Sequence, residues 1–498
     1  MSIPDEKSES KGHSRRRTLV FYPVLLLVVL SPLVAVEITA RLLAPAVEPT
    51  TDDPFIAFSA LRPLFVKNKS GSRYEIAGER LVSFRQQSFP AAKPANVFRV
   101  FCLGGSTVQG RPYSVETAFS TWLELSLNAA GAGTDYEIVN CGGISYASYR
   151  LVPIMREILG HEPDLVIIYM GHNEFLEDRT YAKIRKIPDV LIRLHDILLN
   201  LRSYALAHRY VSQRRHTNGH RAGPKTIMSE EVKTMLDLEQ GLAAYSSDPA
   251  WRQGVIEHFR RNLETMIGLA RRVEVPLIIV NPASNVKDCP PFKSQSRSGL
   301  PEEQVERVAT LRRKAEKVGW SDTYGKLRLL EEAAAIDDRH AGLAYAIGKC
   351  YARLGRMDEA KRWLVQAKDM DVCPLRILES MHNIIRELCD EYRVPLVDIK
   401  AMMEVESEGR IVGNNWLVDH VHPTIDGHQL IAGALFRQME QMEFVSVDQH
   451  WAARRDSSWA EHLASLDAAY YAQGMERLKR LQQWSRGRIP AEAQQPQE

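Results

Sequence analysis

The sequence predicts an α/β fold in which a doubly wound, flavodoxin-like parallel sheet of five strands is flanked by helices. Three observations indicate this fold class. Short aliphatic runs recur along the chain, they lack polar–apolar alternation, and helix-forming segments separate them. Strands that are covered by helices on both faces have this pattern. With 498 residues, 45% of them apolar, the chain exceeds one ordinary domain and can build a sizeable core.

The N-terminal region predicts a membrane anchor. Residues 1–18 are polar and end with an arginine cluster, Arg15 to Arg17, and residues 19–36 then follow without a charge. Such a run is near the lower length limit for spanning a bilayer, and arginines are retained on the cytoplasmic side. We expect one transmembrane helix over 19–36 in the cell (inner) membrane, with the cytoplasmic tail 1–18 before it and the rest of the chain on the extracytoplasmic side. A cleaved signal peptide and a buried helix are the alternatives.

Residues 37–95 contain several prolines and are expected to form a linker with an entry segment that leads into the main α/β domain. We expect that domain to comprise residues 96–290 and 373–443. Five segments within it are predicted strands, namely Phe98–Leu103, Tyr136–Asn140, Asp164–Met170, Pro276–Asn281 and Pro395–Ile399.

Two long gaps between the strands predict helical insertions, and residues 444–498 predict a helical C-terminal extension. The first insertion, 179–260, contains Ile187–Val211, whose leucines have helical spacing; this helix would lie at a membrane surface or pack on the core. The second, 291–372, has the residue spacing of a tetratricopeptide repeat at Ala344, Ile347, Gly348, Tyr351, Gly355, Ala360, Leu364 and Ala367. A second, partial copy of this spacing precedes the first in the sequence, and Lys326 breaks its match because it stands at the position that corresponds to Ala360. Such helices would bind a protein partner or serve only packing.

Glycines and polar residues with catalytic potential follow the predicted strands. Gly104-Gly105-Ser106 follows the first strand, residues 140–150 include the end of the second, and Gly171 to Glu174 follow the third. The last strand leads, after a loop, to an Asp419-x-x-His422 pair. Because ligands collect at the carboxyl ends of strands in an open α/β sheet, we expect these residues to form one site.

The order of these motifs resembles the SGNH, or GDSL-like, hydrolase superfamily, whose four sequence blocks carry Ser, Gly, Asn and His. The stretch GGSTVQG resembles the nucleophile block, with Gly105 at the usual Asp position, and GHNE resembles the Gly-x-Asn-Asp block, with Glu174 replacing Asp. Asp419 and His422 match the Asp-x-x-His block. The second block fits least well, because Ser145 falls where the oxyanion Gly is expected. The resemblance implies an esterase on the fold predicted above.

The chemistry of these residues indicates their roles. Ser106 would be the nucleophile, His422 the base that accepts its proton, and Asp419 the group that orients and stabilises the imidazole. The oxyanion would be bound by the Ser106 N–H, the Asn173 side chain and a backbone N–H of Gly142, Gly143 or Ser145. This mechanism requires no metal or other cofactor.

The remaining histidines and cysteines carry weaker expectations. We expect His420 to face away from His422 on an extended loop, His428 to be structural, and His172 to line the pocket. Cys102 and Cys141 are expected to be buried, Cys350 to lie in the repeat core, and Cys289 and Cys373 to be linked by a disulfide at the base of the insertion.

The sequence thus predicts a membrane-anchored serine esterase or acyl hydrolase that acts on an acyl-ester small molecule or glycan. One alternative is an O-acyltransferase that modifies cell-envelope glycans, because the same acyl-enzyme can be discharged by a sugar hydroxyl. A second is a non-catalytic scaffold that uses the repeat insertion. The formal net charge of +2 gives no general affinity for nucleic acid.

Overall fold

The computed structural model of the chain describes residues 31–42, 63–177, 198–207 and 231–486, apart from residues 33, 132, 199, 200 and 205. The chain divides into two compact units. One comprises residues 1–60 and 180–227, and the other comprises residues 61–179 and 228–498.

In the smaller unit, Glu37 joins two helical segments. Residues 34–42 are helical, and the Glu37 carboxylate accepts the backbone N–H groups of Arg202 and Ser203, each at 2.9 Å. These hydrogen bonds, together with Arg41, lower the pKa of Glu37 to about 2. Most of the predicted anchor over 19–36, and most of Ile187–Val211, lies outside the described residues. Within the described residues, no helix combines the length and the apolar character needed to cross a membrane.

The larger unit is built on a five-stranded parallel sheet with the order β5-β4-β6-β7-β8. All five predicted strands are confirmed. Their bounds are β4 (Val97–Gly104), β5 (Asp135–Gly142), β6 (Leu165–Tyr169), β7 (Leu277–Asn281) and β8 (Leu396–Asp398). Every residue of β6 and β7 is buried, which explains why these runs lack alternation. The strand order is that of a flavodoxin-like sheet.

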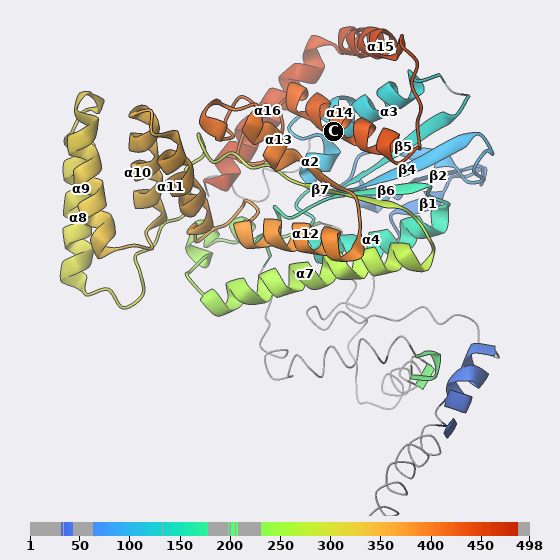
Figure 1. Cartoon of the computed structure of the whole chain (residues 1–498), viewed down its shortest axis with the longest axis horizontal. Coiled ribbons are helices and arrows are strands. Elements are labelled where there is room, and N and C mark those ends of the chain that lie inside the picture. Colours follow the sequence, from blue (N-terminus) through green and yellow to red (C-terminus); the bar gives the residue numbers. More distant parts are fainter. Residues whose placement is uncertain are drawn as a thin grey trace, which may run out of the picture. The chain divides into compact units, whose positions relative to one another are not determined.

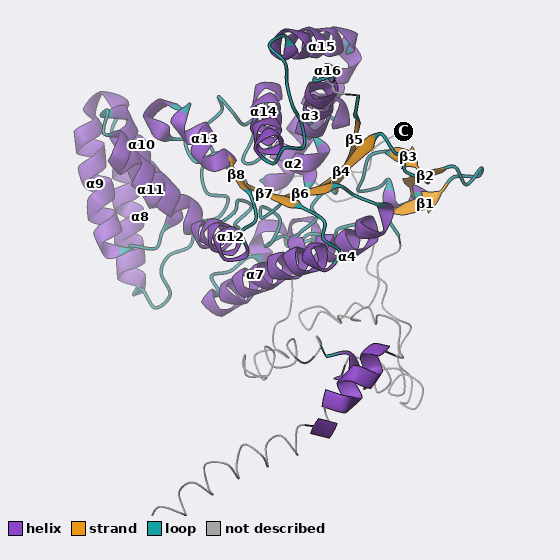
Figure 2. Ribbon diagram, turned by 45° about the vertical axis from the view of Figure 1, so that its right-hand side comes forward, coloured by secondary structure: helices purple, strands orange, loops and turns teal. Residues whose placement is uncertain are grey.

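Helices cover both faces of this sheet, as expected for a doubly wound fold (Figures 1 and 2). One face carries α2 (Ser106–Gln109), α3 (Phe119–Asn128), α13 (Ile399–Val405) and α14 (Ile425–Gln441), and the other carries α4 (Ser148–Ile158), α7 (Pro249–Arg272) and α12 (Glu379–Tyr392). The 24-residue helix α7 runs along the sheet as one element. The predicted insertion boundary at residue 260 therefore falls inside a helix of the sheet layer.

A small antiparallel sheet precedes β4, within the region predicted as a linker with an entry segment. Its strands are β1 (Phe65–Lys67), β2 (Arg73–Ile76) and β3 (Ser88–Pro90). The Phe89 ring lies 5.5 Å from that of Phe101 in β4. The Glu157 carboxylate in α4 accepts the N–H groups of Leu64 and Phe65, each at 2.7 Å. Buried aromatic contacts therefore order residues 64–90 ahead of the main sheet.

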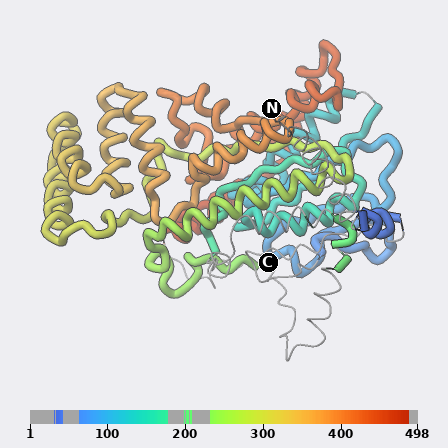
Figure 3. Tube along the Cα trace, turned by 60° about the horizontal axis from the view of Figure 1, so that its bottom comes forward, coloured from blue at the N-terminus to red at the C-terminus, as the bar shows by residue number. Residues whose placement is uncertain are grey.

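Residues 301–369 form four helices, each packed against the next (Figure 3). They are α8 (Glu302–Lys317), α9 (Thr323–Ile336), α10 (Ala341–Arg353) and α11 (Met357–Asp369). A separate apolar core holds them together, with Ile347, Leu364 and Ala360 buried in it. A side chain at Gly348 would begin 2.7 Å from Leu364 Cγ, so this small residue permits the close approach of α10 and α11. Assignment of the segment to the tetratricopeptide repeats stays a prediction.

The C-terminal extension is helical over α15 (Trp451–Ser465) and α16 (Ala468–Ser485). Short 3₁₀ turns occur at Gly78–Arg80, Val115–Thr117, Leu159–His161, Met235–Asp237, Gly241–Ala244, Trp320–Asp322 and Glu408–Arg410.

The predicted disulfide between Cys289 and Cys373 is wrong, because all six cysteines are free. Cys373 is fully buried in an apolar cluster that includes Tyr245 and Trp484. The Cys289 Sγ is directed to the carbonyl oxygen of Pro290, at 3.6 Å. Each sulfur thus has a different neighbour. Cys102, Cys141 and Cys350 are buried, as expected.

The Gly348 contact predicts opposite effects of one substitution at two helical glycines. Gly348→Ala should lower the free energy of unfolding by about 1 kcal/mol, because the clash with Leu364 outweighs the gain in helix propensity. Gly268→Ala in α7, where the new methyl group meets nothing within 4 Å, should raise it by about 0.5–1 kcal/mol. Urea denaturation measures both values. Equal effects at the two positions would contradict close packing at Gly348.

Candidate active site

The two glycines before Ser106 are required by close contacts at the end of β4. A side chain at Gly104 would begin 2.1 Å from the carbonyl oxygen of Tyr169 in the neighbouring strand. A side chain at Gly105 would begin 2.5 Å from Nδ2 of Asn173. The glycine pair therefore lets the segment that carries Asn173 approach the residue that follows, Ser106, which begins α2.

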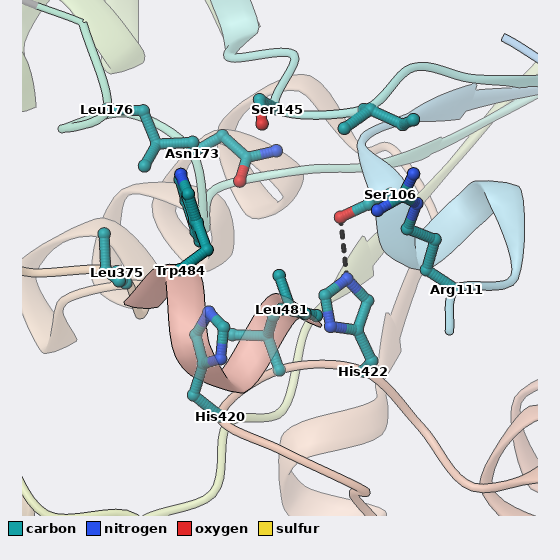
Figure 4. A pocket seen from close by; sticks show the side chains of 12 residues that line it. Ser106, Arg111, Ser145, Asn173, Leu176, Leu375, His420, His422, Leu481 and Trp484 are labelled. Carbon is teal, nitrogen blue, oxygen red and sulfur yellow. Dashed lines mark hydrogen bonds between the residues drawn. The ribbon is translucent and has the colours of Figure 1, made fainter. Parts of the chain in front are cut away.

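The structure brings Ser106, His422 and Asp419 together in a continuous chain of hydrogen bonds (Figure 4 shows the first). Ser106 Oγ lies 2.8 Å from His422 Nε2, and His422 Nδ1 lies 2.7 Å from Asp419 Oδ2. His422 is only 2% exposed. In this arrangement the imidazole can accept the serine proton while the carboxylate stabilises the imidazolium that forms.

A tight loop positions the histidine. Asp419 Oδ1 accepts the backbone N–H groups of Val421 at 2.9 Å and His422 at 2.8 Å, as in an Asx-type turn. A bridge between Leu417 and Pro423 closes the loop. Burial alone would raise the pKa of Asp419, but the His422 and His420 rings and the hydrogen bonds from His422 hold it well below its usual value. The carboxylate is therefore ionised near neutral pH.

The three predicted backbone donors, Gly142, Gly143 and Ser145, differ in whether their N–H groups are already used. The N–H of Gly142 donates to Asn140 Oδ1 at 2.9 Å, and that of Gly143 donates to the Gly104 carbonyl at 3.0 Å. The prediction that Gly142 or Gly143 donates to the oxyanion is therefore wrong, because both N–H groups already donate within the protein. Ser145 lines the cavity with a φ of 60°, and no described residue accepts a hydrogen bond from its N–H.

Asn173 lines the same cavity and is held by its own neighbours. Its Nδ2 donates to the Tyr146 carbonyl at 3.1 Å, which leaves its second amide hydrogen for a ligand. The next residue, Glu174, is fully buried and accepts from the Ser148 N–H at 2.7 Å and the Ser148 hydroxyl at 2.8 Å. Asn262 of α7 donates to the same hydroxyl. Glu174 thus fixes the segment that carries Asn173 to α4 and α7.

A cavity of about 30 Å³ lies beside Ser106. Its walls include the apolar side chains of Ile144, Leu176 and Leu375, and one end of α16 contributes Leu481 and Trp484 (Figure 4). Because no local motif marks α16, its place at the site is not predictable from the sequence.

Side-chain hydrogen bonds hold α16 in this position. Trp484 Nε1 donates to Asp237 Oδ1 at 2.7 Å. Arg477 Nη1 donates to the Tyr113 carbonyl at 2.6 Å. At the other end of the helix, the Tyr470 hydroxyl lies 2.8 Å from Thr117 Oγ1. The C-terminal extension is therefore part of the cavity wall.

The other histidines occupy different positions from those expected, with one exception. His420 lines the cavity, and its ring lies 5.9 Å from that of His422; the loop is curled, so the prediction that His420 faces away is wrong. His172 is buried and accepts from the Ile377 N–H at 3.3 Å, and it is not part of the cavity lining. His428 is fully buried in α14 and accepts the Phe119 N–H, consistent with a structural role. Burial lowers the pKa of His420 to about 4 and that of His428 to about 3.

No protein-family model matches the sequence, and no curated protein matches it. Solved structures of similar fold include a lipase/acylhydrolase from Enterococcus faecalis, with 12% identity, a TM-score of 0.32 and coverage of 71% of this chain and 99% of that one. A member of the lipolytic protein G-D-S-L family from Veillonella parvula shows 8% identity, a TM-score of 0.30 and coverage of 68% and 97%. A variant of a Geobacillus acetyl-xylooligosaccharide esterase shows 11% identity and a TM-score of 0.31, with coverage of 69% of this chain and 94% of that one. With such TM-scores, these similarities do not define the function, which has to be inferred from the geometry of the site.

The geometry predicts that Ser106 reacts with a fluorophosphonate, a reagent that labels serines activated by a base. Wild-type protein should be labelled on the peptide that contains Ser106, and His422→Ala should lose the label, because a neutral serine is a poor nucleophile. Ser70→Ala removes an exposed serine outside the site and serves as the matched control. Mass spectrometry of the labelled peptides gives the result. Labelling that survives in His422→Ala would contradict activation by this histidine.

Proposed function

We propose that this protein is a serine hydrolase that cleaves O-acyl esters, with Ser106 as nucleophile, His422 as general base and Asp419 as its orienting carboxylate. The observation that carries this proposal is the unbroken pair of short hydrogen bonds, 2.8 Å and 2.7 Å, from Ser106 Oγ through the imidazole to Asp419. A purely structural role does not call for a serine hydroxyl, an imidazole and a buried carboxylate in this order at the wall of a cavity.

The first half-reaction transfers the acyl group to the enzyme. His422 Nε2 takes the proton as Ser106 Oγ attacks the acyl carbon, and the carbonyl oxygen becomes an oxyanion. The Ser145 N–H and the Asn173 Nδ2 are the donors at the cavity, together with the Ser106 N–H, which lies in the first turn of α2 and has no helical carbonyl partner. The C–O bond to the alcohol then breaks, and His422 returns the proton to the leaving oxygen.

The second half-reaction releases the acyl group. Water attacks the acyl-enzyme with His422 again as base, and the free acid and Ser106 are regenerated. An acyltransferase would differ only here, because a sugar hydroxyl would replace the water. The assay of free acid against acylated glycan, in the presence of a glycan acceptor, separates the two reactions.

The location of the enzyme and the role of its helical insertion belong to the proposal as well. The charge-free run over 19–36 would anchor it in the cell membrane, with the catalytic unit on the extracytoplasmic side. An O-acylated glycan of the cell envelope would then be within reach. The helices α8 to α11 would bind a protein partner.

The cavity size favours a short acyl group. About 30 Å³ beside Ser106 holds roughly two water-sized groups, and the pocket opens to solvent beyond this space, where the alcohol portion of an ester can extend. An acetyl group has two carbons and fits this space. A long acyl chain would need to displace Leu481 or Trp484, and α16 is held by the hydrogen bonds described above.

Substitutions in the hydrogen-bonded chain should remove turnover of p-nitrophenyl acetate. Ser106→Ala and His422→Ala should each lower kcat by about 10⁶, since both act in one step. Asp419→Ala should cost less, and Asn173→Ala should cost about 10²–10³ through loss of an oxyanion donor. His450→Ala, at an exposed histidine outside the site, is the matched control. Wild-type turnover in a folded Ser106→Ala protein would refute the mechanism.

The cavity also predicts the acyl-chain preference. The kcat/KM for the p-nitrophenyl ester should fall by about tenfold or more from acetate to octanoate, because the longer chain meets Leu481 and Trp484. Leu481→Ala should enlarge the cavity and narrow this difference. Met475→Ala on the exposed face of the same helix should leave the difference unchanged. A wild-type enzyme that prefers octanoate would contradict the short-acyl assignment.

A further inference from the structure

Arg111 is a cavity residue that the proposed mechanism does not use. It lines the same cavity as Ser106, and Figure 4 draws both side chains. The backbone connects the two residues closely, because the Arg111 N–H donates to the Ser106 carbonyl at 3.1 Å. The Arg111 Nε atom is buried and has no hydrogen-bond partner.

Two other arginines lie near Arg111, and their charges repel it. Arg85 faces a cleft of about 580 Å³ that also includes Ser114 and Glu116, and its Nε is likewise buried without a partner. Arg477 donates to the Pro112 and Tyr113 carbonyls. Burial, with the charges of Arg85 and Arg477, lowers the pKa of Arg111 to about 10.

The described residues supply no carboxylate to balance this group. None of the ion pairs among them, taken to 4.0 Å, includes Arg111, Arg85 or Arg477. The exposed Glu116 acts electrostatically on Arg477. A partly buried charge without an ion-pair partner is costly. The Arg111 guanidinium at the cavity wall, with the Arg85 and Arg477 charges nearby, therefore favours a ligand that brings a negative charge.

Arginines that are more deeply buried than Arg111 show how such groups are satisfied elsewhere in the described part of the protein. Arg99 pairs with Glu137 at 2.6 Å, and Arg150 pairs with Glu177 at 2.6 Å. Arg80 has no hydrogen-bond partner, but its guanidinium lies over the Phe84 and Tyr146 rings, at 5.2 and 5.8 Å. Among the described residues, Arg111 has neither a carboxylate nor a ring.

We propose that the ester substrate carries an oxyanion group, a carboxylate or a phosphate, on its alcohol portion, and that Arg111 binds this group beside the reacting ester. The inference rests on the proposed function and adds the chemical class of the substrate. The planar guanidinium presents paired N–H donors that match a carboxylate or a phosphate. The Arg85 and Arg477 charges increase the local positive potential. The anion is not consumed, because it leaves with the alcohol after the acyl C–O bond breaks.

The first experiment compares acetyl esters of three sugars, namely glucuronic acid, glucose 6-phosphate and glucose. Wild-type kcat/KM should favour at least one anionic ester over the neutral one by about tenfold or more, the value of one charge-assisted hydrogen bond. The two anionic arms distinguish a carboxylate from a phosphate. Arg111→Gln should bring the ratio of kcat/KM for the anionic ester to kcat/KM for the neutral ester near one, and Arg111→Lys should restore part of this preference. Arg328→Gln removes the same charge on the exposed face of α9 and should leave the ratio unchanged.

Two outcomes of this comparison would overturn the proposal. One is a wild-type ratio near one for both anionic esters. The other is an equal loss for all three esters in Arg111→Gln, because the arginine would then act on the transition state and not on a substrate charge. Hydrolysis of the neutral ester with either outcome would leave the proposed esterase activity intact.

A binding measurement keeps the test independent of turnover. Calorimetry with the Ser106→Ala protein should show tighter binding of glucuronate or glucose 6-phosphate than of glucose. The added Arg111→Gln substitution should abolish that difference in affinity. Absence of any preference for an anion would refute the role of Arg111, whether or not the wild-type enzyme hydrolyses esters.

Discussion

The buried carboxylate of Asp419 is the group on which the geometry of the site depends. It accepts two backbone N–H groups of its own loop and holds the His422 ring, so one side chain shapes the loop and aims the base. The carbonyl of the same residue is tied to Asn285, beyond the end of β7, at 3.1 Å. Removing a carboxylate from water costs several kcal/mol unless partners compensate. Here the compensating partners of Asp419 are two N–H groups of its own loop and the His422 ring. The same contacts hold the imidazole at hydrogen-bond distance from Ser106.

The features that could be predicted from the sequence are those with local signals. The five strands have continuous apolar runs, and the convergence of Ser106, Asn173 and His422 follows from their positions after strands of one parallel sheet. The antiparallel strands over 65–90 were missed, because segments of three or four residues have no usable period.

Other parts of the site depend on three-dimensional contacts that no motif encodes. The choice of Ser145 over Gly142 and Gly143 required knowing which N–H groups are already bonded. The position of His420 at the cavity depends on the turn that the Asp419 carboxylate stabilises. Leu481 and Arg111 have no pattern around them, and their roles appear only because α16 and the loop after α2 face the same cavity. Several costly features surround this one cavity, including a serine at positive φ and an unpaired guanidinium. Such violations of local rules gather where function requires them.

The four helices of residues 301–369 lie within the connection between β7 and β8, two neighbouring strands of the sheet. The entropy of closing a loop grows only with the logarithm of its length, so a connection eight times longer costs about 2 kcal/mol more. Because α8 to α11 bury a core of their own, they offset most of their own ordering cost. The sheet can therefore carry this module as an exchangeable attachment. The surface of these helices can therefore change without altering the contact between Ser106 and His422.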